Sequence, residues 1–315
     1  MVQSAQRICS LLPSATEIVY ALGLGDRLVA VTHECDYPLD ASGHPAVTSA
    51  GFNPASMSNK DIHNHVTENV HSGSSIYTLD QPLLEQLNPD LILTQELCDV
   101  CAVSYDTVKD AVRHLCGDNT ILSLEPTSLA AILDTIMQVG SATGTESQAE
   151  QVVAELKARI AAVKERAGAA AERPRVFTME WMDPPFAGGH WVPEMVRLAG
   201  GTAGIVLAGQ PSREVTWDEI VTFDPEIIVV MPCGYHLDAL ESEFRLTPFP
   251  AAWGDLKAVR RGQVYAVDAT AYFSRPGPRV VDGLEVMAEI IHPEIFPRQK
   301  PLDAWRALEL RDCEQ

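Results

Sequence analysis

The sequence predicts an α/β protein made of two lobes with mostly parallel sheets, joined by one long helix. Three observations predict this fold: strands and helices alternate, a pattern of helix, turn, strand and cysteine occurs in each half, and a long amphipathic segment separates the halves. We therefore expect three parts: an N-terminal lobe over residues 1–145, a connecting helix over 146–172 and a C-terminal lobe over 173–315.

A strand is expected at the start of each half. "RICSLL" (residues 7–12) precedes the turn "PSATE", and "RVFTME" (175–180) precedes "WMDPPFAGG". Short apolar runs bounded by proline and glycine turns are typical of buried strands. These two runs are therefore predicted to be the opening strands of the two halves.

A later strand in each half follows a repeated turn. "LLEQLNPDLILTQELC" (83–98) and "EIVTFDPEIIVVMPC" (219–233) each contain a short helix, an Asn/Asp-Pro-acid turn, an apolar strand and a cysteine. Ligands of parallel α/β sheets bind beyond the carboxyl ends of the strands. Both cysteines follow such an end, so the pattern predicts a ligand site there.

One long helix is expected between the halves. Residues 146–166 contain no glycine or proline, and their apolar residues recur at steps of three and four. This spacing is typical of an amphipathic helix. About 22 residues would span roughly 33 Å, the width of a small domain.

Composition and charge exclude several classes of function. The 315 residues carry 23 Lys+Arg against 43 Asp+Glu, a net charge of −20, which opposes binding to nucleic acid and to anionic membranes. No apolar segment approaches the ~20 residues needed to cross a bilayer, so no membrane insertion is expected. The N-terminus shows neither a signal peptide nor a lipobox, which predicts a cytoplasmic location. The usual hydrolase, phosphate-loop and zinc-protease motifs are missing, so we expect no enzyme.

The chain resembles the helical-backbone, periplasmic-binding-protein-like family, and within it the cobalamin-binding substrate-binding proteins of ABC transporters. The matching stretches are "SLLPSATEIVYALGLGDRLVAVTHECDYP", "NPDLILT", "DPPFAGG", "LAGG", "DPEIIVV" and "YFSRPGPRVVDGLEVMAEII". The resemblance implies two Rossmann-like lobes joined by a backbone helix, and non-catalytic binding of cobalamin or a related corrinoid in the cleft between them. Family relatives are often periplasmic.

The resemblance also implies contact residues. Tyr37, Phe186 and Tyr272 match aromatic residues that pack on the corrin, and rigid aromatic faces suit a large flat macrocycle. We place Trp191, in "GGHWVPE", on the same rim, and expect Arg275 to meet a polar edge of the ligand.

Histidines near the predicted strand ends offer another kind of contact. His33 and His236 lie on the predicted rim, and His190 follows "AGG". A neutral imidazole could ligate the cobalt of a bound corrinoid, or complete a mixed metal site. A rim histidine that only forms hydrogen bonds at the surface is the other interpretation.

The cysteines support an alternative function. Cys35, Cys98, Cys101 and Cys233 each follow an apolar strand, and four converging thiolates could hold zinc or an iron–sulfur cluster. The alternative is therefore an intracellular metal-binding or cluster-binding protein. Small apolar packing residues are the simpler interpretation of these cysteines. A second alternative ligand is an iron-siderophore, although the sequence offers few clustered arginines for an anionic chelate.

A transport partner is also implied by the resemblance. Family members dock onto an ABC importer permease through one acidic residue on each lobe. At the position expected in the second lobe this chain has Ser274, within "YFSRPGPR". The sequence therefore departs from the family at the predicted permease contact.

Overall fold

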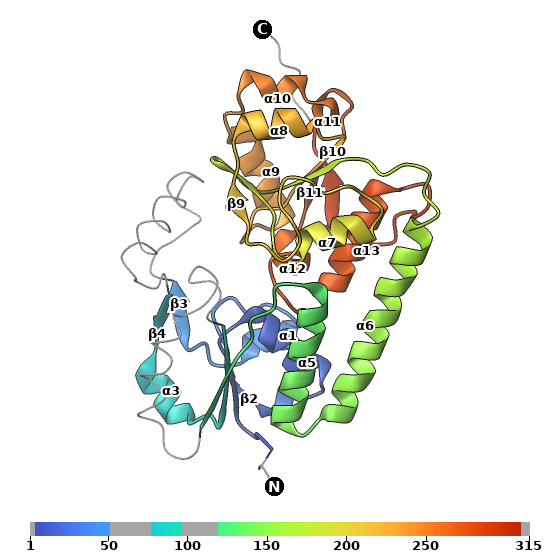
Figure 1. Ribbon diagram of the computed structural model, residues 1–315. Coiled ribbons are helices and arrows are strands. Elements are labelled where there is room, and N and C mark those ends of the chain that lie inside the picture. The colour runs from blue at the N-terminus through green and yellow to red at the C-terminus, as the bar shows by residue number, and fades with distance from the viewer. Residues whose placement is uncertain (1–3, 51–76, 96–118, 310–315) are drawn as a thin grey trace. The chain divides into compact units, whose positions relative to one another are not determined.

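A computed structural model describes residues 4–50, 77–95 and 119–309 (Figure 1). The chain divides into two compact units. The first contains residues up to Pro126 together with Ala130–Glu155, and the second contains Thr127–Leu129 and everything from Leu156 onward. The division falls within α6 (Glu146–Ala167), a continuous helix of 22 residues. This helix confirms the one predicted from apolar spacing.

The first unit is built on a parallel sheet of four strands in the order β2-β1-β5-β6. Its strands are β1 (Ile8–Ser10), β2 (Leu28–Ala30), β5 (Leu91–Thr94) and β6 (Thr120–Ser123). A separate antiparallel pair joins β3 (Thr48–Ala50) to β4 (Tyr77–Leu79). Every residue of β1 and β5 is buried, as expected for central strands of a parallel sheet.

Helices lie between strands of this unit along the chain and follow the last of them. They are α1 (Pro13–Ala21), α3 (Gln81–Leu87) and α5 (Leu129–Thr143), with 3₁₀ turns η1 (Gly25–Arg27) and η2 (Leu39–Gly43). Pro13 occupies the first turn of α1, where its missing N–H costs no hydrogen bond. A Cβ atom on Gly140 of α5 would lie 2.6 Å from the Cβ of Ala149, so α5 and the first part of α6 pack backbone to backbone.

Four charged side chains attach the second part of α6 to its own unit. Arg159 contacts Asp282 at 2.8 Å and Glu285 at 2.7 Å, and Lys300 contacts the same two carboxylates at 2.6 and 2.5 Å. Burial opposes the ionisation of Asp282, but the hydrogen bond from Lys300 and the charge of Arg159 outweigh it and hold its pKa below the ordinary value. Opposite charges in equal number keep this half-buried cluster neutral.

The second unit has a mixed sheet of six strands in the order β12-β11-β10-β7-β8-β9. Its strands are β7 (Val176–Met182), β8 (Pro185–Ala187), β9 (Arg213–Glu214), β10 (Ile227–Val230), β11 (Val264–Val267) and β12 (Trp305–Ala307). The central strands β7, β10 and β11 are parallel, whereas β8, β9 and β12 run antiparallel. The antiparallel edge has a local cause, because only two residues separate β7 from β8, and such a connection can only make a hairpin.

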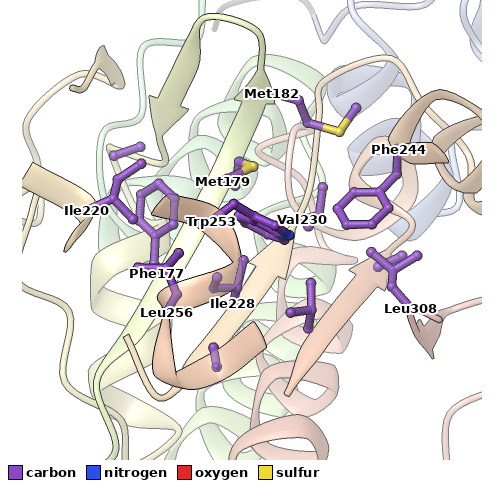
Figure 2. Close-up of a cluster of buried hydrophobic side chains, with 14 of the residues drawn as sticks. Phe177, Met179, Met182, Ile220, Ile228, Val230, Phe244, Trp253, Leu256 and Leu308 are labelled. Atoms are coloured by element: carbon purple, nitrogen blue, oxygen red, sulfur yellow. The ribbon is translucent and has the colours of Figure 1, made fainter. Parts of the chain in front are cut away.

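One apolar cluster fills one face of this sheet (Figure 2). Phe177, Met179, Ile228 and Val230 are alternate residues of β7 and β10, so they share a face, and helix residues such as Trp253 pack on them. The helices of the unit are α7 (Val192–Leu198), α8 (Trp217–Phe223), α9 (Leu237–Leu246), α10 (Ala251–Asp255), α11 (Lys257–Arg260), α12 (Ala269–Tyr272) and α13 (Val280–Ile291). The fold is thus the predicted α/β class.

The repeated turn has the same geometry in both units. Asn88 ends α3 with φ 41° and ψ 64°, and Asp224 ends α8 with φ 46° and ψ 67°. Asparagine and aspartate tolerate this left-handed conformation better than most residues, and the proline that follows each of them stops the helix. The similarity seen in the sequence is therefore a structural repeat.

An arginine fastens each copy of the turn. The Arg7 guanidinium donates to the carbonyls of Leu87 and Asn88, and that of Arg175 donates to the carbonyls of Phe223 and Asp224. The acidic residue after each proline also accepts a hydrogen bond from the main chain of the same arginine. Asp90 accepts from the main-chain N–H of Arg7 at 2.9 Å, and Glu226 accepts from that of Arg175 at 3.1 Å.

We expect Arg175→Ala to lower the free energy of unfolding by about 1–2 kcal/mol, because it removes several hydrogen bonds to the carbonyls that end α8. Arg173→Ala is the matched control. Arg173 is exposed and its main-chain carbonyl, which accepts from Thr202, survives the substitution, so we expect a change within about 0.5 kcal/mol. Denaturant titrations followed by circular dichroism measure both, and equal losses would contradict the role of Arg175.

Candidate ligand-binding site

Three parallel strands of the second unit end at one edge of its sheet. The register pairs β10 with β7 on one side and with β11 on the other, all in the same direction. The segments that follow these strands begin at Asp183, Met231 and Asp268. Since ligands of parallel α/β sheets bind beyond this edge, the side chains there form the candidate site.

Three aromatic side chains gather beside the ends of β7 and β10. The rings of Trp181 and Tyr235 meet edge to face with centroids 5.9 Å apart, and Phe186 lies opposite Trp181 in the register of β7 and β8. All three are half-buried. Burial, and to a smaller extent the charge of Glu243, raises the pKa of Tyr235 to about 12, so its phenol stays neutral near pH 7. These three aromatic side chains are therefore uncharged near pH 7.

A fourth aromatic side chain follows β11. Tyr272 is the last residue of α12, and the Arg279 guanidinium lies 5.9 Å from the centre of its ring, within cation–π distance. Close packing fixes this short helix, because a Cβ atom on Gly283 of α13 would lie 2.2 Å from the carbonyl oxygen of Tyr272. Only glycine at position 283 leaves room for the backbone of Tyr272 at this position.

Asp268 connects two segments of this edge. Its Oδ1 accepts from the main-chain N–H of Ala271 at 2.8 Å, which caps α12, and its Oδ2 lies 2.8 Å from Nδ1 of His236. The imidazole of His236 is 60% exposed, whereas the side chain of Asp268 is only 13% exposed. A nearly buried carboxylate therefore holds an exposed imidazole at the strand ends.

A buried carboxyl group lies beneath the "AGGH" segment. Burial raises the pKa of Glu180, and hydrogen bonds with the Ser212 side chain and the Gly189 main chain only partly oppose the rise. A Cβ atom on Gly189 would lie 2.3 Å from the main-chain nitrogen of Ser212. Only glycine permits this close approach to Ser212, and both residues form hydrogen bonds with Glu180.

Two predicted contact residues of this unit are buried. The Trp191 ring packs inside the unit, and its Nε1 donates to the carbonyl of Phe273 at 2.9 Å. Arg275 is also buried. Both sit close in sequence to the exposed edge, and their burial favours a supporting role. Direct ligand contact, as predicted from the sequence, would need a rearrangement of each side chain.

Ser274, the residue at the predicted permease contact, is half-buried just after α12. Its main-chain N–H donates to the carbonyl of Ala269 at 2.8 Å. This bond fixes its position at the end of the helix.

The first unit has its own carboxyl edge, where His33 and Tyr37 follow β2. Nδ1 of His33 lies 2.8 Å from the Thr48 hydroxyl, and its ring is 5.4 Å from that of Tyr77. Tyr37 is 48% exposed. Among the large apolar side chains that are exposed in the described part of the chain, Tyr37 is the one aromatic.

The structure describes two of the four cysteines of the alternative prediction. Cys35 is buried and its sulfur contacts the hydroxyls of Thr16 at 3.0 Å and Thr32 at 3.5 Å, while Cys233 is exposed in the other unit. Cys98 and Cys101 lie outside the described residues. Within the residues that the structure describes, no group of three histidines, cysteines or acids could hold a metal ion.

Sequence analysis did not single out Trp181, Tyr235 or Asp268. A signal existed for Asp268, because an acid that directly follows the apolar run "VYAV" lies at a strand end. Trp181 and Tyr235 are 54 residues apart and meet only through the pairing of β7 with β10, which no local pattern predicts.

Half-buried aromatic side chains beyond the carboxyl edge of a parallel sheet are a surface of the kind that binds a solute. The chain belongs to the periplasmic binding protein family, whose sequence model matches residues 8–271. Members of this family are substrate-binding proteins, which confirms the prediction that the chain is not an enzyme.

Individual relatives agree with this family. An ABC transporter substrate-binding lipoprotein of Bacillus subtilis is 29% identical over 92% of this chain and 81% of its own length. A vitamin B12-binding protein of Vibrio cholerae is 26% identical over 89% of this chain and 87% of its own length.

Solved structures show the same fold. A periplasmic vitamin B12-binding protein of Vibrio cholerae superposes with a TM-score of 0.66 at 24% identity, covering 93% of this chain and 99% of that one. A periplasmic heme-binding protein of Pseudomonas aeruginosa gives 0.71 at 18% identity, covering 98% and 99%. Because one fold accompanies different ligands, these structures do not identify the ligand.

The relatives also bear on location. They are periplasmic or lipoprotein substrate-binding proteins, so the cytoplasmic location predicted from the sequence has no support among them. Within residues 4–50, 77–95 and 119–309, no helix is long and apolar enough to span a bilayer.

Proposed function

We propose that the chain binds a corrinoid, with cobalamin as the reference ligand, and that the carboxyl edge of the second unit's sheet supplies contacts to it. The observation that carries the proposal is the match, over most of the chain, to curated relatives named vitamin B12-binding protein, at 26% identity for that of Vibrio cholerae. The relative named as a substrate-binding lipoprotein of an ABC transporter supports delivery to an importer permease.

The chemistry of the edge fits such a ligand. A corrinoid is a large, flat ring with amide side chains, so it needs both apolar faces and polar partners. Trp181, Phe186, Tyr235 and Tyr272 supply half-buried rings that lose little side-chain freedom on contact. His236, exposed beside them, supplies a polar group.

The contacts predicted from the sequence remain part of the proposal. Tyr37, Phe186 and Tyr272 are proposed as aromatic contacts, and Arg275 and Trp191 as residues that support them. The described residues give no contact that favours the four-cysteine metal site or an iron-siderophore ligand. Both remain as competitors in the titration below.

Isothermal titration of the purified protein with cyanocobalamin tests the proposal. We expect one site per chain with a dissociation constant in the micromolar range or below, and no comparable heat from a ferric siderophore. Absence of cobalamin binding by folded protein would refute the proposal. Metal analysis of the same anaerobic preparation tests the zinc or iron–sulfur alternative.

A pair of surface variants tests the role of Tyr37. Tyr37→Ala should weaken cobalamin binding about tenfold, because stacking on an aromatic ring is worth roughly 0.5–1.5 kcal/mol beyond the area buried. Leu39→Ala is the matched control, since Leu39 lies two residues away and is 82% exposed. Equal affinities for the two variants would remove Tyr37 from the site.

A further inference from the structure

We propose that His236 is an axial ligand to the metal of the bound macrocycle, and that Asp268 is the residue that positions it. This inference rests on the proposed function, and it adds a covalent, metal-directed contact to a site that is otherwise described by aromatic packing.

The hydrogen bond between Asp268 and His236 prepares the imidazole for coordination. A carboxylate only accepts, so the 2.8 Å contact assigns the proton to Nδ1 of His236 and the lone pair to Nε2. Histidines that ligate metals almost always donate their other ring N–H to a carboxylate, a carbonyl or water. With 60% of its side chain exposed, the imidazole is accessible to a large ligand.

The Asp268 carboxylate is also held in place by a second hydrogen bond and by burial. Its second oxygen, Oδ1, accepts from the N–H of Ala271 and caps α12, and its side chain is 13% exposed. The helix that it caps ends at Tyr272. One carboxylate therefore fixes both the imidazole and the start of the helix that carries a proposed aromatic contact.

The other candidate histidines lack this arrangement. Nδ1 of His33 meets the neutral hydroxyl of Thr48, and its Nε2 lies 3.7 Å from the Glu34 carboxylate. His190 is half-buried with its ring stacked 5.7 Å from that of Trp191, and burial lowers its pKa. Of these three histidines, His236 is the one whose exposure and carboxylate partner fit a metal ligand.

The step is a ligand substitution that involves no redox partner. In aquocobalamin the bond between cobalt(III) and its water breaks, a bond from cobalt to Nε2 of His236 forms, and the water leaves. The oxidation state of cobalt is unchanged. His236 also makes a further interaction within the protein.

A comparison of aquocobalamin with cyanocobalamin distinguishes coordination of cobalt by His236 from binding of the macrocycle alone. We expect the visible bands of aquocobalamin to shift to those of an imidazole complex when the protein is added. Those of cyanocobalamin should stay in place, because cyanide holds the exchangeable position. His236→Ala should abolish the shift of the aquocobalamin bands. His44→Ala, which removes a half-buried histidine that contacts Tyr20, should keep the shift.

Asp268→Asn tests the positioning role. Asparagine keeps an oxygen to cap α12 but loses the charge that holds His236. We expect the preference for aquocobalamin over cyanocobalamin to fall 10- to 100-fold, the usual effect of removing such a partner. The inference is overturned if aquocobalamin binds without a shift, or if the shift persists in His236→Ala. Failure of both cobalamins to bind refutes the proposed function itself, and so the two failures are distinguishable.

Discussion

Alanine in place of Gly283 should lower the free energy of unfolding by about 3 kcal/mol, the upper part of the usual range for overpacking. The added Cβ would lie 2.2 Å from the carbonyl oxygen of Tyr272 and 3.1 Å from Cε of Met195. The methionine can adjust, but the carbonyl belongs to the backbone at the end of α12 and cannot move alone. The helix must shift, and with it Tyr272.

Gly254→Ala is the matched control for this substitution. Gly254 also lies in a helix of the second unit, α10, but a Cβ atom there would meet nothing within 4 Å. Since alanine favours a helix over glycine by roughly 1 kcal/mol, we expect this variant to be unchanged or more stable. Thermal and denaturant unfolding measure both variants. If Gly283→Ala is as stable as the wild type, α12 is not fixed by this contact.

The displacement should also be visible in ligand binding. Because Asp268 caps α12 and holds His236, a shift of the helix disturbs an aromatic and a polar contact together. We expect Gly283→Ala, measured at a temperature where it is folded, to bind cobalamin more weakly than Gly254→Ala.

The sequence predicted the parts of the fold whose signals are local. The helix over residues 146–167 follows from apolar spacing within one segment. The turns at Asn88 and Asp224 follow from a residue that tolerates positive φ, placed before proline. Each of these predictions depends only on residues that are neighbours along the chain, so distant contacts in the folded protein do not change them.

Features set by distant contacts were harder to predict. The antiparallel strand β8 follows β7 after a two-residue turn, within the segment "WMDPPFAGG", where no strand was predicted. Trp191 was placed on the rim because of its neighbours in sequence. Its indole N–H instead donates to the carbonyl of Phe273, 82 residues away, and the Trp191 side chain is buried. Polarity alone does not indicate which side of a loop a tryptophan occupies.

Trp181→Ala should weaken cobalamin binding about 30-fold, which corresponds to about 2 kcal/mol, the threshold usual for a dominant contact residue. Trp181 is the largest ring at the end of β7, and it meets Tyr235 edge to face at 5.9 Å. Its removal takes away one aromatic face and leaves the Tyr235 ring without its neighbour. Calorimetric titration of folded protein gives the affinity.

Trp217→Ala controls for the loss of a tryptophan in the same unit. Trp217 is half-buried on α8, where the centre of its ring lies 6.1 Å from that of Trp253. The Trp217→Ala substitution should lower stability without changing the affinity for cobalamin. Equal binding by Trp181→Ala and the wild type would exclude Trp181 from the site.

The Trp181→Phe variant distinguishes the contribution of the aromatic ring from that of the indole N–H. Nε1 of Trp181 is buried and has no hydrogen-bond partner among the described residues, an arrangement that normally costs about 1–3 kcal/mol. If the ligand uses only the aromatic face, phenylalanine should retain most of the affinity, and it should gain stability because the unpaired donor is gone. If an amide oxygen of the corrinoid accepts from Nε1, phenylalanine should instead bind nearly as weakly as alanine. The comparison of the two variants therefore shows whether the site recognises the ring of the ligand or its polar edge.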